Sequence, residues 1–225
     1  MNVVTRRHWH KKTVYLKEYE SPALLDLIEN IDQLSCPVHY LKEGDTTTVM
    51  RVEVNDKTWV IKKYNLINMW SRIKRALTLS RAARSWRFSF LLRCLEIKTP
   101  SPIAFIENAW GPFRKESYFI SEYIPGVTAL DYFSKFTSKE EEMIVMANKL
   151  LRQIKLLFQA GVTYGDMKAS NFIINPEGVF FVDLEGMRRY KNSFLFKRAK
   201  MRDIKRFKKN WKEMPLCQEI FFSLT

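Results

Sequence analysis

The segment Tyr164-Gly-Asp166-Met-Lys168-Ala-Ser-Asn171, followed twelve residues later by Asp183 at the end of an apolar strand, decides the fold of this chain. Phosphoryl transfer from a nucleotide needs a carboxylate that orients and deprotonates the acceptor hydroxyl, and oxygen ligands that hold a metal ion against the phosphates. An Asp, an Asn five residues later and a second Asp provide these groups in the order found in kinases. The pattern predicts Asp166 as the base, Asn171 and Asp183 as magnesium ligands, and Lys168 as a contact of the transferring phosphate.

The residues between the two metal ligands predict a hairpin. Residues 172–175 and 179–182 are short and apolar, and Asn175-Pro-Glu-Gly178 between them is a turn signal. The hairpin brings Asn171 and Asp183 to the same end of the strand pair. A single Asp in such a place more often caps a turn or lies exposed at a strand end. The three groups together, at this spacing, favour a kinase-type site over that structural interpretation.

A nucleotide site also needs a cation for the phosphates that are not transferred. Residues 58–64 read as a strand that pairs with residues 49–54 across a tight turn. Strand alternation places Val60 and Lys62 on one face, with Val60 toward the adenine and Lys62 toward the phosphates. Lys63 falls on the other face, where we expect a solvated surface lysine.

Two further segments complete the predicted ATP site. Residues 41–49 occupy the position of a phosphate-covering loop but contain one glycine, Gly44, so the hydroxyls of Thr46, Thr47 and Thr48 are expected to replace some amide donors. Glu122 and Tyr123 precede Pro125-Gly126 and predict the hinge between two lobes, with backbone groups available to the adenine.

At this point the chain resembles a known family, the lipopolysaccharide core kinases of the Kdo/WaaP type, including InaA-like members. Residues 81–86, 97–107, 164–173 and 182–188 carry the resemblance, which covers roughly residues 41–211. It implies an α+β, two-lobed protein-kinase-like fold with a small β-rich N-terminal lobe and a mainly helical C-terminal lobe. It also implies ATP and Mg²⁺ as cofactors, and a heptose or Kdo sugar of the lipopolysaccharide inner core, or its lipid-linked precursor, as acceptor.

The sequence departs from the family pattern at three positions. Tyr164 stands where the catalytic loop usually begins with His, in a role that mostly supports the loop. The metal strand continues Asp183-Leu-Glu185, which adds a second carboxylate. Ser85 stands where a helix glutamate would pair with Lys62, so this lysine either has another partner, for which Glu107 and Glu185 are candidates, or acts unpaired.

The predicted organisation is an N-terminal extension over residues 1–40, an N-lobe over 41–123, and a C-lobe over 124–225 that ends in a basic helix. Within it we expect helices at about 22–34, 71–95 and 141–160. Ser21 is a candidate N-cap for the first helix. Ser138 and Glu141 form a candidate capping box for the third.

The positive charge is concentrated in two segments. Residues 72–93 contain seven Lys and Arg and no acid, and residues 187–212 contain twelve against one acid, Asp203. Amphipathic helices with solvated outer faces account for part of this pattern. The remaining positive charge fits a protein that binds an anionic membrane surface. A nucleic acid is the alternative partner, since a formal net charge of +14 is compatible with both. No recognised nucleic-acid motif accompanies the charge, so we expect the membrane.

Composition narrows the class of protein further. Cys36, Cys94 and Cys217 are far apart, and no C-x-x-C or Cys/His pattern exists, so neither a disulfide framework nor a zinc site is expected. The N-terminus lacks the apolar core of a signal peptide, and no stretch approaches the roughly 18 apolar residues of a spanning helix. These features and the resemblance together predict a cytoplasmic protein, peripheral on the cytoplasmic face of the inner membrane.

Three functions stay open at this level. The first is a kinase for a lipopolysaccharide core sugar, and the second a kinase-like enzyme for a protein or small-molecule hydroxyl. The third is a catalytically silent nucleotide-binding module with a basic association surface. The presence of Lys62, Asp166, Asn171 and Asp183 argues against the third, whereas the missing helix glutamate supports it.

Overall fold

The computed structural model describes residues 2–34, 36–65, 79–110 and 113–222, which form two compact units. The first unit comprises Met1–Ser89 and Ser101–Tyr123, and the second comprises Phe90–Pro100 and Ile124–Thr225. The chain passes from the first unit to the second after Tyr123, at the hinge that the sequence predicts. Residues 90–100 belong to the second unit, which the sequence prediction does not anticipate.

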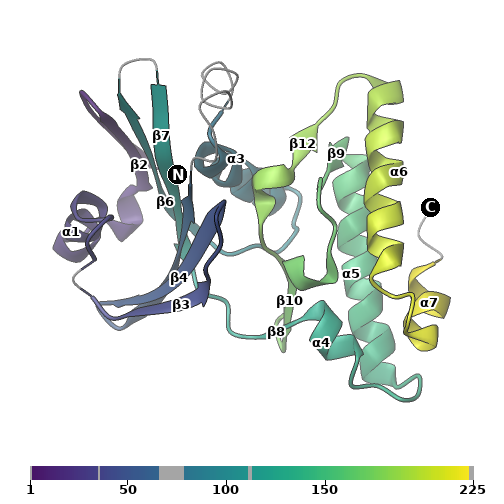
Figure 1. The fold of residues 1–225 in the computed structure, drawn as a ribbon. Helices are drawn as coiled ribbons and strands as arrows, with labels where there is room; N and C mark the ends of the chain where they lie inside the picture. Colours follow the sequence, from purple (N-terminus) through teal and green to yellow (C-terminus); the bar gives the residue numbers. More distant parts are fainter. Residues whose placement is uncertain (1, 35, 66–78, 111–112, 223–225) are drawn as a thin grey trace. The chain divides into compact units, whose positions relative to one another are not determined.

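The first unit is built on one antiparallel sheet in the order β1-β2-β6-β7-β5-β4-β3 (Figure 1). Its strands are β1 (Val3–His8), β2 (Lys11–Leu16), β3 (Val38–Lys42), β4 (Thr47–Val54), β5 (Lys57–Tyr64), β6 (Pro102–Trp110) and β7 (Phe113–Glu122). Asn55 and Asp56, both at positive φ, form the tight turn between β4 and β5. Asn and Asp tolerate this left-handed conformation better than other residues with a side chain.

The N-terminal residues are part of this sheet and not an extension outside the lobe. β2 pairs with β6, from Lys11 opposite Asn108 to Tyr15 opposite Ala104, and β1 pairs with β2 at the edge. Helix α1 (Pro22–Glu29) follows, and Ser21 is its N-cap, as expected, with Oγ accepting from the Leu24 amide. The helix is shorter than the predicted 22–34.

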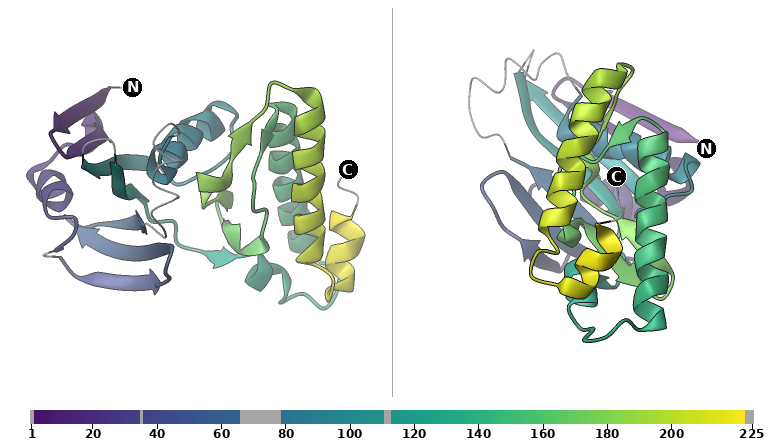
Figure 2. Two further views of the ribbon diagram at one scale, coloured as in Figure 1. Left: turned by 45° about the horizontal axis from the view of Figure 1, so that its top comes forward. Right: turned by 90° about the vertical axis from the view of Figure 1, so that its right-hand side faces the viewer.

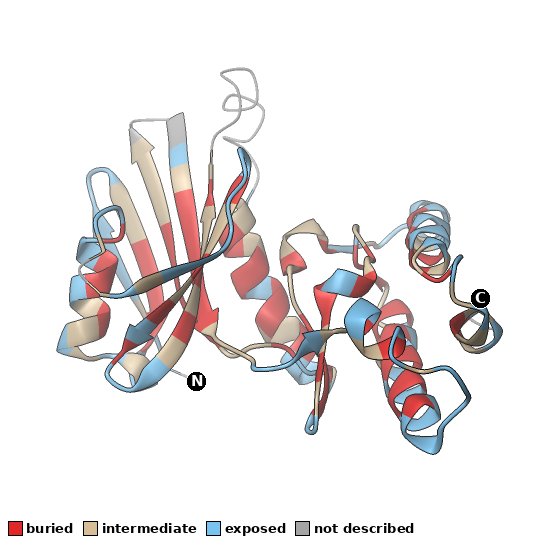
Figure 3. Ribbon diagram, turned by 60° about the horizontal axis from the view of Figure 1, so that its bottom comes forward, coloured by how far each residue is buried: buried red, intermediate tan, exposed pale blue. Residues whose placement is uncertain are grey.

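Among the described elements, helix α1 lies on one face of the sheet and helix α3 on the other (Figures 1 and 3). Leu24, Leu27 and Ile28 of α1 share one buried cluster with the strand residues Trp59 and Ile61. On the other face, α3 (Arg81–Cys94) packs Trp86 against Phe105, with ring centroids 5.5 Å apart. Val60 and Lys62 lie on the face of α3, because they alternate with the buried Trp59 and Ile61. Of the helix predicted at 71–95, residues 71–78 lie outside the described residues.

The second unit is mainly helical. Its helices are α4 (Ala129–Phe133), α5 (Glu141–Gln159), α6 (Ser193–Lys209) and α7 (Pro215–Phe221), and its short strands are β8 (Val127–Thr128), β9 (Val162–Thr163), β10 (Phe172–Asn175), β11 (Gly178–Phe181) and β12 (Arg188–Arg189). Helices α5 and α6 both pack against the short strand β9 (Figures 1 and 2). β10 pairs with β11 and β8, and β9 pairs with β12. The hairpin predicted between the metal ligands is therefore present.

An aromatic core joins the helices of this unit to the hairpin. Phe207 and Trp211 contact each other and Phe221, and Phe207 also reaches Phe172 of β10. Such pairs contribute about 0.5–1.5 kcal/mol each beyond the area they bury. Ile204, Phe207 and Trp211 are all buried, so the inner face of α6 and the residues just after it fix the strands that end at the metal ligands.

Helix α5 differs from its prediction at its first turn. Its N-cap is Glu140, and no side chain caps it, so the capping box of Ser138 is wrong. At the same turn Met143 is fully buried, whereas Ile144 is 38% exposed. Among the described helices, none combines the length and the apolar character needed to cross a bilayer.

Candidate active site

Asp166 lies in the loop between β9 and β10 and is held by two cations. Lys168 Nζ lies 2.6 Å from its Oδ2, and Arg206 Nε of α6 lies 3.3 Å from its Oδ1. The carboxylate is 43% exposed, so an acceptor hydroxyl has access to it. The arrangement suits a general base whose orientation is fixed from two sides.

Asn171 and Asp183 lie together at one end of the hairpin, as the sequence predicts. The Val182 amide donates to the Asn171 carbonyl at 3.0 Å, which places Asp183 one residue beyond this bond. Asn171 Nδ2 donates to the Asp166 carbonyl at 2.9 Å, so the other atom of its amide, the oxygen, is left for a ligand. One amide and one carboxylate oxygen suit Mg²⁺, which is usually held by one or two protein ligands together with substrate phosphates and water. Among the described residues there is no cluster of three His, Cys, Asp or Glu that would hold a metal by itself.

The backbone of this end is unusual at two positions. Asp183 adopts the left-handed conformation, with φ 61° and ψ 57°, just before a short 3-10 turn over Leu184–Gly186. Gly165 has φ 88°, and a Cβ there would collide with the backbone of Gly186. The catalytic loop and the segment after Asp183 therefore approach each other as bare backbone. Strain of this kind concentrates at functional sites.

Tyr164, in the position of the usual histidine, ties the two loops together. Its side chain is fully buried, and its hydroxyl is shared between the carbonyls of Asn171, at 3.1 Å, and Val182. Burial, reinforced by the negative charges of Asp183, Asp166 and Asp203, raises the pKa of this phenol well above its ordinary value, so it remains a donor. Tyr164 thus supports both metal-ligand segments through one hydroxyl.

Asp203 of α6 holds the backbone of the catalytic loop, a role that our sequence analysis missed. Its buried carboxylate accepts from the Tyr164 amide at 2.6 Å and from the Gly165 amide at 3.0 Å. Burial raises its pKa, and the two amide hydrogen bonds partly offset the rise. About two turns further, at the C-cap of α6, Asn210 Nδ2 donates to the Met167 carbonyl at 3.1 Å. The signal for Asp203 was its position as the one acid in the basic segment 187–212.

The other predicted site residues belong to the first unit. Lys62 lies on β5 opposite Val49, with Nζ 5.5 Å from the ring centroid of Tyr64, and Val60 lies two residues away on the same face. Lys63, on the opposite face, is not simply solvated, because its Nζ lies 3.3 Å from Asp32 Oδ1 and over the Tyr118 ring. The separation of the two lysines by face agrees with the predicted register.

The three threonines differ in their surroundings. Thr47 is buried, and its Oγ1 accepts from Arg81 at 2.9 Å, while a second nitrogen of Arg81 donates to the Thr46 carbonyl. Thr48 lies opposite Lys63, so its side chain is on the face away from Lys62. This leaves the exposed Thr46 as the threonine whose hydroxyl best suits a phosphate.

The amides at the predicted hinge are already bonded within the first unit. The Glu122 amide donates to the Ser101 carbonyl, and the Tyr123 amide donates to the Thr58 carbonyl, both at 3.0 Å. The Glu122 carboxylate accepts from the Tyr19 hydroxyl at 2.7 Å. The backbone of these two residues is therefore not fully available to adenine, and any contact from them would use carbonyl oxygens.

Ser85, which replaces the helix glutamate, links α3 to the sheet by another bond. Its Oγ lies 3.0 Å from the hydroxyl of Tyr64, in the buried interior. Glu107, one candidate partner for Lys62, lies instead 3.3 Å from Lys12. The helix of this lobe is therefore attached to β5 through Tyr64, two residues beyond Lys62.

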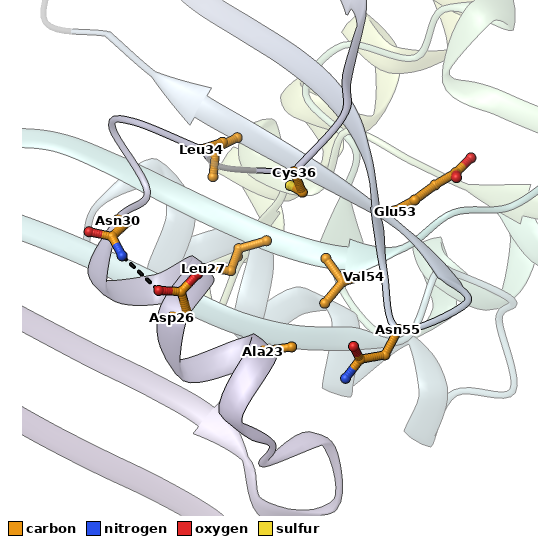
Figure 4. Close-up of a pocket in the computed structure, with 9 residues that line it drawn as sticks. All are labelled: Ala23, Asp26, Leu27, Asn30, Leu34, Cys36, Glu53, Val54 and Asn55. Atoms are coloured by element: carbon orange, nitrogen blue, oxygen red, sulfur yellow. Dashed lines mark hydrogen bonds between the residues drawn. The ribbon is translucent and has the colours of Figure 1, made fainter.

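A separate hollow of about 220 Å³ lies in the first unit between α1 and the β4–β5 turn (Figure 4). Asp26, which bonds to Asn30, and Glu53 lie on its wall. Among the described residues that line it there is no Lys or Arg. The acidic side chains on its wall would repel a phosphate, so this hollow does not suit a nucleotide.

Comparison with known proteins assigns the fold and the family. The model of the family described as "Lipopolysaccharide kinase (Kdo/WaaP) family" matches residues 35–220 of the 225 in this chain. The chain belongs to this family. The sequence-based family prediction and the α+β, kinase-like fold class are thereby confirmed, and membership supports phosphotransferase activity.

Individual relatives are distant from this member of the family. It is 28% identical over 81 residues to the "Probable serine/threonine-protein kinase mkcE" of Dictyostelium discoideum, 26% over 132 residues to the "KEOPS complex subunit Bud32" of Pyrococcus abyssi, and 22% over 142 residues to the "Lipopolysaccharide core heptose(I) kinase WaaP" of Escherichia coli. These alignments cover 36%, 59% and 60% of the chain, but only 11%, 54% and 54% of the respective relatives. A solved structure of WaaP in complex with acyl carrier protein aligns over 86% of the chain and 85% of its own length, with a TM-score of 0.56 and 17% identity, which supports the fold alone.

Proposed function

We propose that this chain is an ATP-dependent kinase that phosphorylates a hydroxyl of a heptose or Kdo sugar in the lipopolysaccharide inner core. The observation that carries the proposal is the junction of Asp166, Asn171 and Asp183, fixed by the hydrogen bonds of Tyr164 and Asp203. Family membership supports the acceptor class, and the match to WaaP of E. coli agrees with it.

The proposed reaction uses Asp166 as the base. The acceptor oxygen forms a bond to the γ-phosphorus of ATP, while the bond from this phosphorus to the oxygen bridging to the β-phosphate breaks. ADP leaves with the bridging oxygen, and the hydroxyl proton passes to Asp166. Lys168, which contacts Asp166, would offset negative charge on the transferring phosphate.

Asp183 and Asn171 would hold the magnesium ion. When bound, this ion would neutralise charge on the phosphate oxygens. In the first unit, Lys62 would contact the non-transferring phosphates, Val60 the adenine, and the carbonyls of Glu122 and Tyr123 the rim of the adenine site. Thr46 would cover the phosphates. Thr47 and Thr48 fit this role less well, because one is engaged by Arg81 and the other faces away.

The two adjacent lysines of β5 provide a matched test of the nucleotide site. Lys62→Ala is expected to weaken ATP binding by about tenfold or more, because a charge-assisted contact to phosphate is lost. Lys63→Ala should leave ATP binding unchanged, and the loss of its exposed pair with Asp32 should shift stability little. Isothermal titration with Mg·ATP measures both. Equal losses in the two variants would show that the face of β5 does not decide nucleotide binding.

The acceptor assay tests the proposed function directly. Purified protein, incubated with ATP and with core lipopolysaccharide that has been dephosphorylated chemically, is expected to add one phosphate, seen as a mass increase of the core oligosaccharide. Lipopolysaccharide from a deletion strain should lack the same phosphate. If neither preparation changes while the protein binds ATP, the core sugar is not the acceptor.

A second acceptor class has specific support in the match to a probable serine/threonine-protein kinase. That alignment covers 36% of this chain, so it supports the second class less than the family match supports the first. The assay separates the two, because phosphate would then appear on serine or threonine of a protein substrate and not on the sugar.

We also propose that α6 docks on the anionic surface of the membrane that carries the acceptor. Phe194, Leu195 and Met201 on this helix are 71%, 52% and 61% exposed. Arg198 and Lys205 lie on the same side as Phe194 and Met201, at helical spacings of three or four residues. Exposed apolar side chains among cations are typical of a helix that lies in a membrane interface. The buried side of the same helix carries Asp203 and Phe207.

Vesicle sedimentation tests this surface. The protein is expected to sediment with vesicles of anionic lipid and not with neutral ones. The pair Arg198→Glu and Lys205→Glu should weaken this association by more than about tenfold, since each basic residue contributes on the order of 1 kcal/mol. The pair Arg152→Glu and Lys155→Glu, exposed on α5, makes the same charge change as a control. Salt-sensitive binding to RNA or DNA without any preference for anionic vesicles would contradict the proposal.

A further inference from the structure

A basic pocket adjoins the candidate base within the second unit. It has a volume of about 230 Å³ and is formed by the catalytic loop, α4 and the last turn of α6. The residues that line it are Leu130, Lys168, Ala169, Ser170, Arg206, Lys209 and Asn210. Three of them are cations, and among the described lining residues none is acidic. The single carboxylate of Asp166 contacts Lys168 and Arg206 and compensates part of this charge, so a net positive charge is left for a ligand.

The pocket and Asp166 share two side chains. Lys168 and Arg206 line the pocket, and both also contact the carboxylate of Asp166, at 2.6 Å and 3.3 Å. Lys168 and Arg206 would therefore contact both Asp166 and a group bound in the pocket. Such a group would lie close to the hydroxyl that Asp166 deprotonates. The occupant would then be part of the acceptor, or a group close to it, and not a remote effector.

The remaining polar groups show which atoms are left for a ligand. Asn210 Nδ2 donates to the carbonyls of Met167 and Phe207, at 3.1 and 2.9 Å, so this residue builds the wall of the pocket. Within the described part of the chain, Lys209 has no ion-pair partner and the hydroxyl of Ser170 has no hydrogen bond. Lys209 is exposed at the end of α6. The ammonium of Lys209 and the hydroxyl of Ser170 are thus the groups that can bind an anion.

We propose that this pocket binds an anionic group, a carboxylate or a phosphate, carried by the acceptor next to the hydroxyl that is phosphorylated. Lys209 and Ser170 bind the anion directly, and Arg206 and Lys168 bridge it to the base. Charge-assisted hydrogen bonds of this kind are about twice as strong as neutral ones. The inference rests on the proposed kinase function and deepens it, because it selects anionic over neutral sugars as acceptors.

Matched acceptors and one lysine pair test the inference. Kdo is compared with its methyl ester, and a heptose phosphate with the free heptose, in steady-state kinetics with saturating ATP. In one or both pairs we expect a KM at least about tenfold lower for the anionic member than for the neutral one. A difference in the Kdo pair would identify a carboxylate as the bound group, and a difference in the heptose pair would identify a phosphate. Lys209→Ala should raise this KM about tenfold and leave the KM for ATP and for the neutral member unchanged.

Lys208→Ala is the control variant. Its ammonium lies over the Phe222 ring, 5.6 Å from the centroid, and outside the pocket. It should keep the wild-type KM for every acceptor. Equal KM values for the anionic and neutral members, or an equal effect of Lys209→Ala on both, would overturn the inference.

A binding measurement separates this inference from the kinase assignment. Inorganic phosphate is titrated into the protein without nucleotide, for the wild type, Lys209→Ala and Lys208→Ala. Weaker binding in Lys209→Ala alone upholds the anion pocket even if no acceptor is turned over, in which case the proposed function fails and the pocket does not. Equal binding by all three proteins, or none by the wild type, overturns the pocket whatever the kinase activity.

Discussion

Asp166→Asn is expected to lower kcat by about 100-fold or more, because the acceptor hydroxyl loses its proton acceptor in the transition state. The substitution keeps the shape of the side chain, and the variant should fold, since its pairs with Lys168 and Arg206 are partly exposed and contribute little to stability. Phosphate transfer from labelled ATP to the acceptor gives kcat. Titration with Mg·ATP should show unchanged nucleotide binding.

Asp183→Asn tests whether Asp183 is a metal ligand, in contrast to Asp166, which is the proposed base. This variant should lose magnesium-dependent ATP binding as well as turnover, because one of two proposed metal ligands loses its charge. Binding of ATP without magnesium should change much less. If Asp166→Asn retained wild-type turnover, the base would have to be another group, and if Asp183→Asn bound Mg·ATP normally, the metal assignment would fail.

The site in the second unit could be predicted because its information is local in the sequence. The Asp166-to-Asn171 spacing and the turn Asn175-Pro-Glu-Gly178 lie within a few residues of the strands they organise. The structure places the Val182 amide on the Asn171 carbonyl, as the hairpin requires. Tyr164 also fits its expected supporting role, and its hydroxyl supplies the bond that holds the two loops.

Contacts between distant parts of the sequence could not be predicted in the same way. Lys12 and Glu107 are 95 residues apart, and their strands pair through backbone groups that every sequence possesses. Periodicity therefore gave no signal that β1 and β2 join the sheet. Arg206 was one of twelve basic residues in its segment, and nothing in the sequence distinguished it from the others. The exposure of Phe194 and Met201 also depends on the fold and not on the local pattern.

Asp203 is the residue outside the reacting centre whose loss should matter most. Its carboxylate is 3% exposed and accepts from the amides of Tyr164 and Gly165, immediately before the base. Asp203→Ala removes the acceptor of two backbone N–H groups, each of which costs about 1–3 kcal/mol when buried without a partner. We expect the free energy of unfolding in urea to fall by about 2–4 kcal/mol. Asp45→Ala, in an exposed turn, is the control and should change it little.

The isosteric variant Asp203→Asn separates the hydrogen bonds from the charge. It keeps one oxygen that can accept from the Tyr164 amide, so its loss of stability should be smaller than that of Asp203→Ala. Because burial raises the pKa of Asp203 in the folded state, this carboxyl contributes most stability below its unfolded pKa of about 3.9, and the contribution is lost as pH rises through the folded value. The advantage of the wild type over Asp203→Asn should therefore shrink from acid toward neutral pH. An advantage that grows over this range would mean that the two amides lower the pKa more than burial raises it, and that the ionised carboxylate itself holds the catalytic loop.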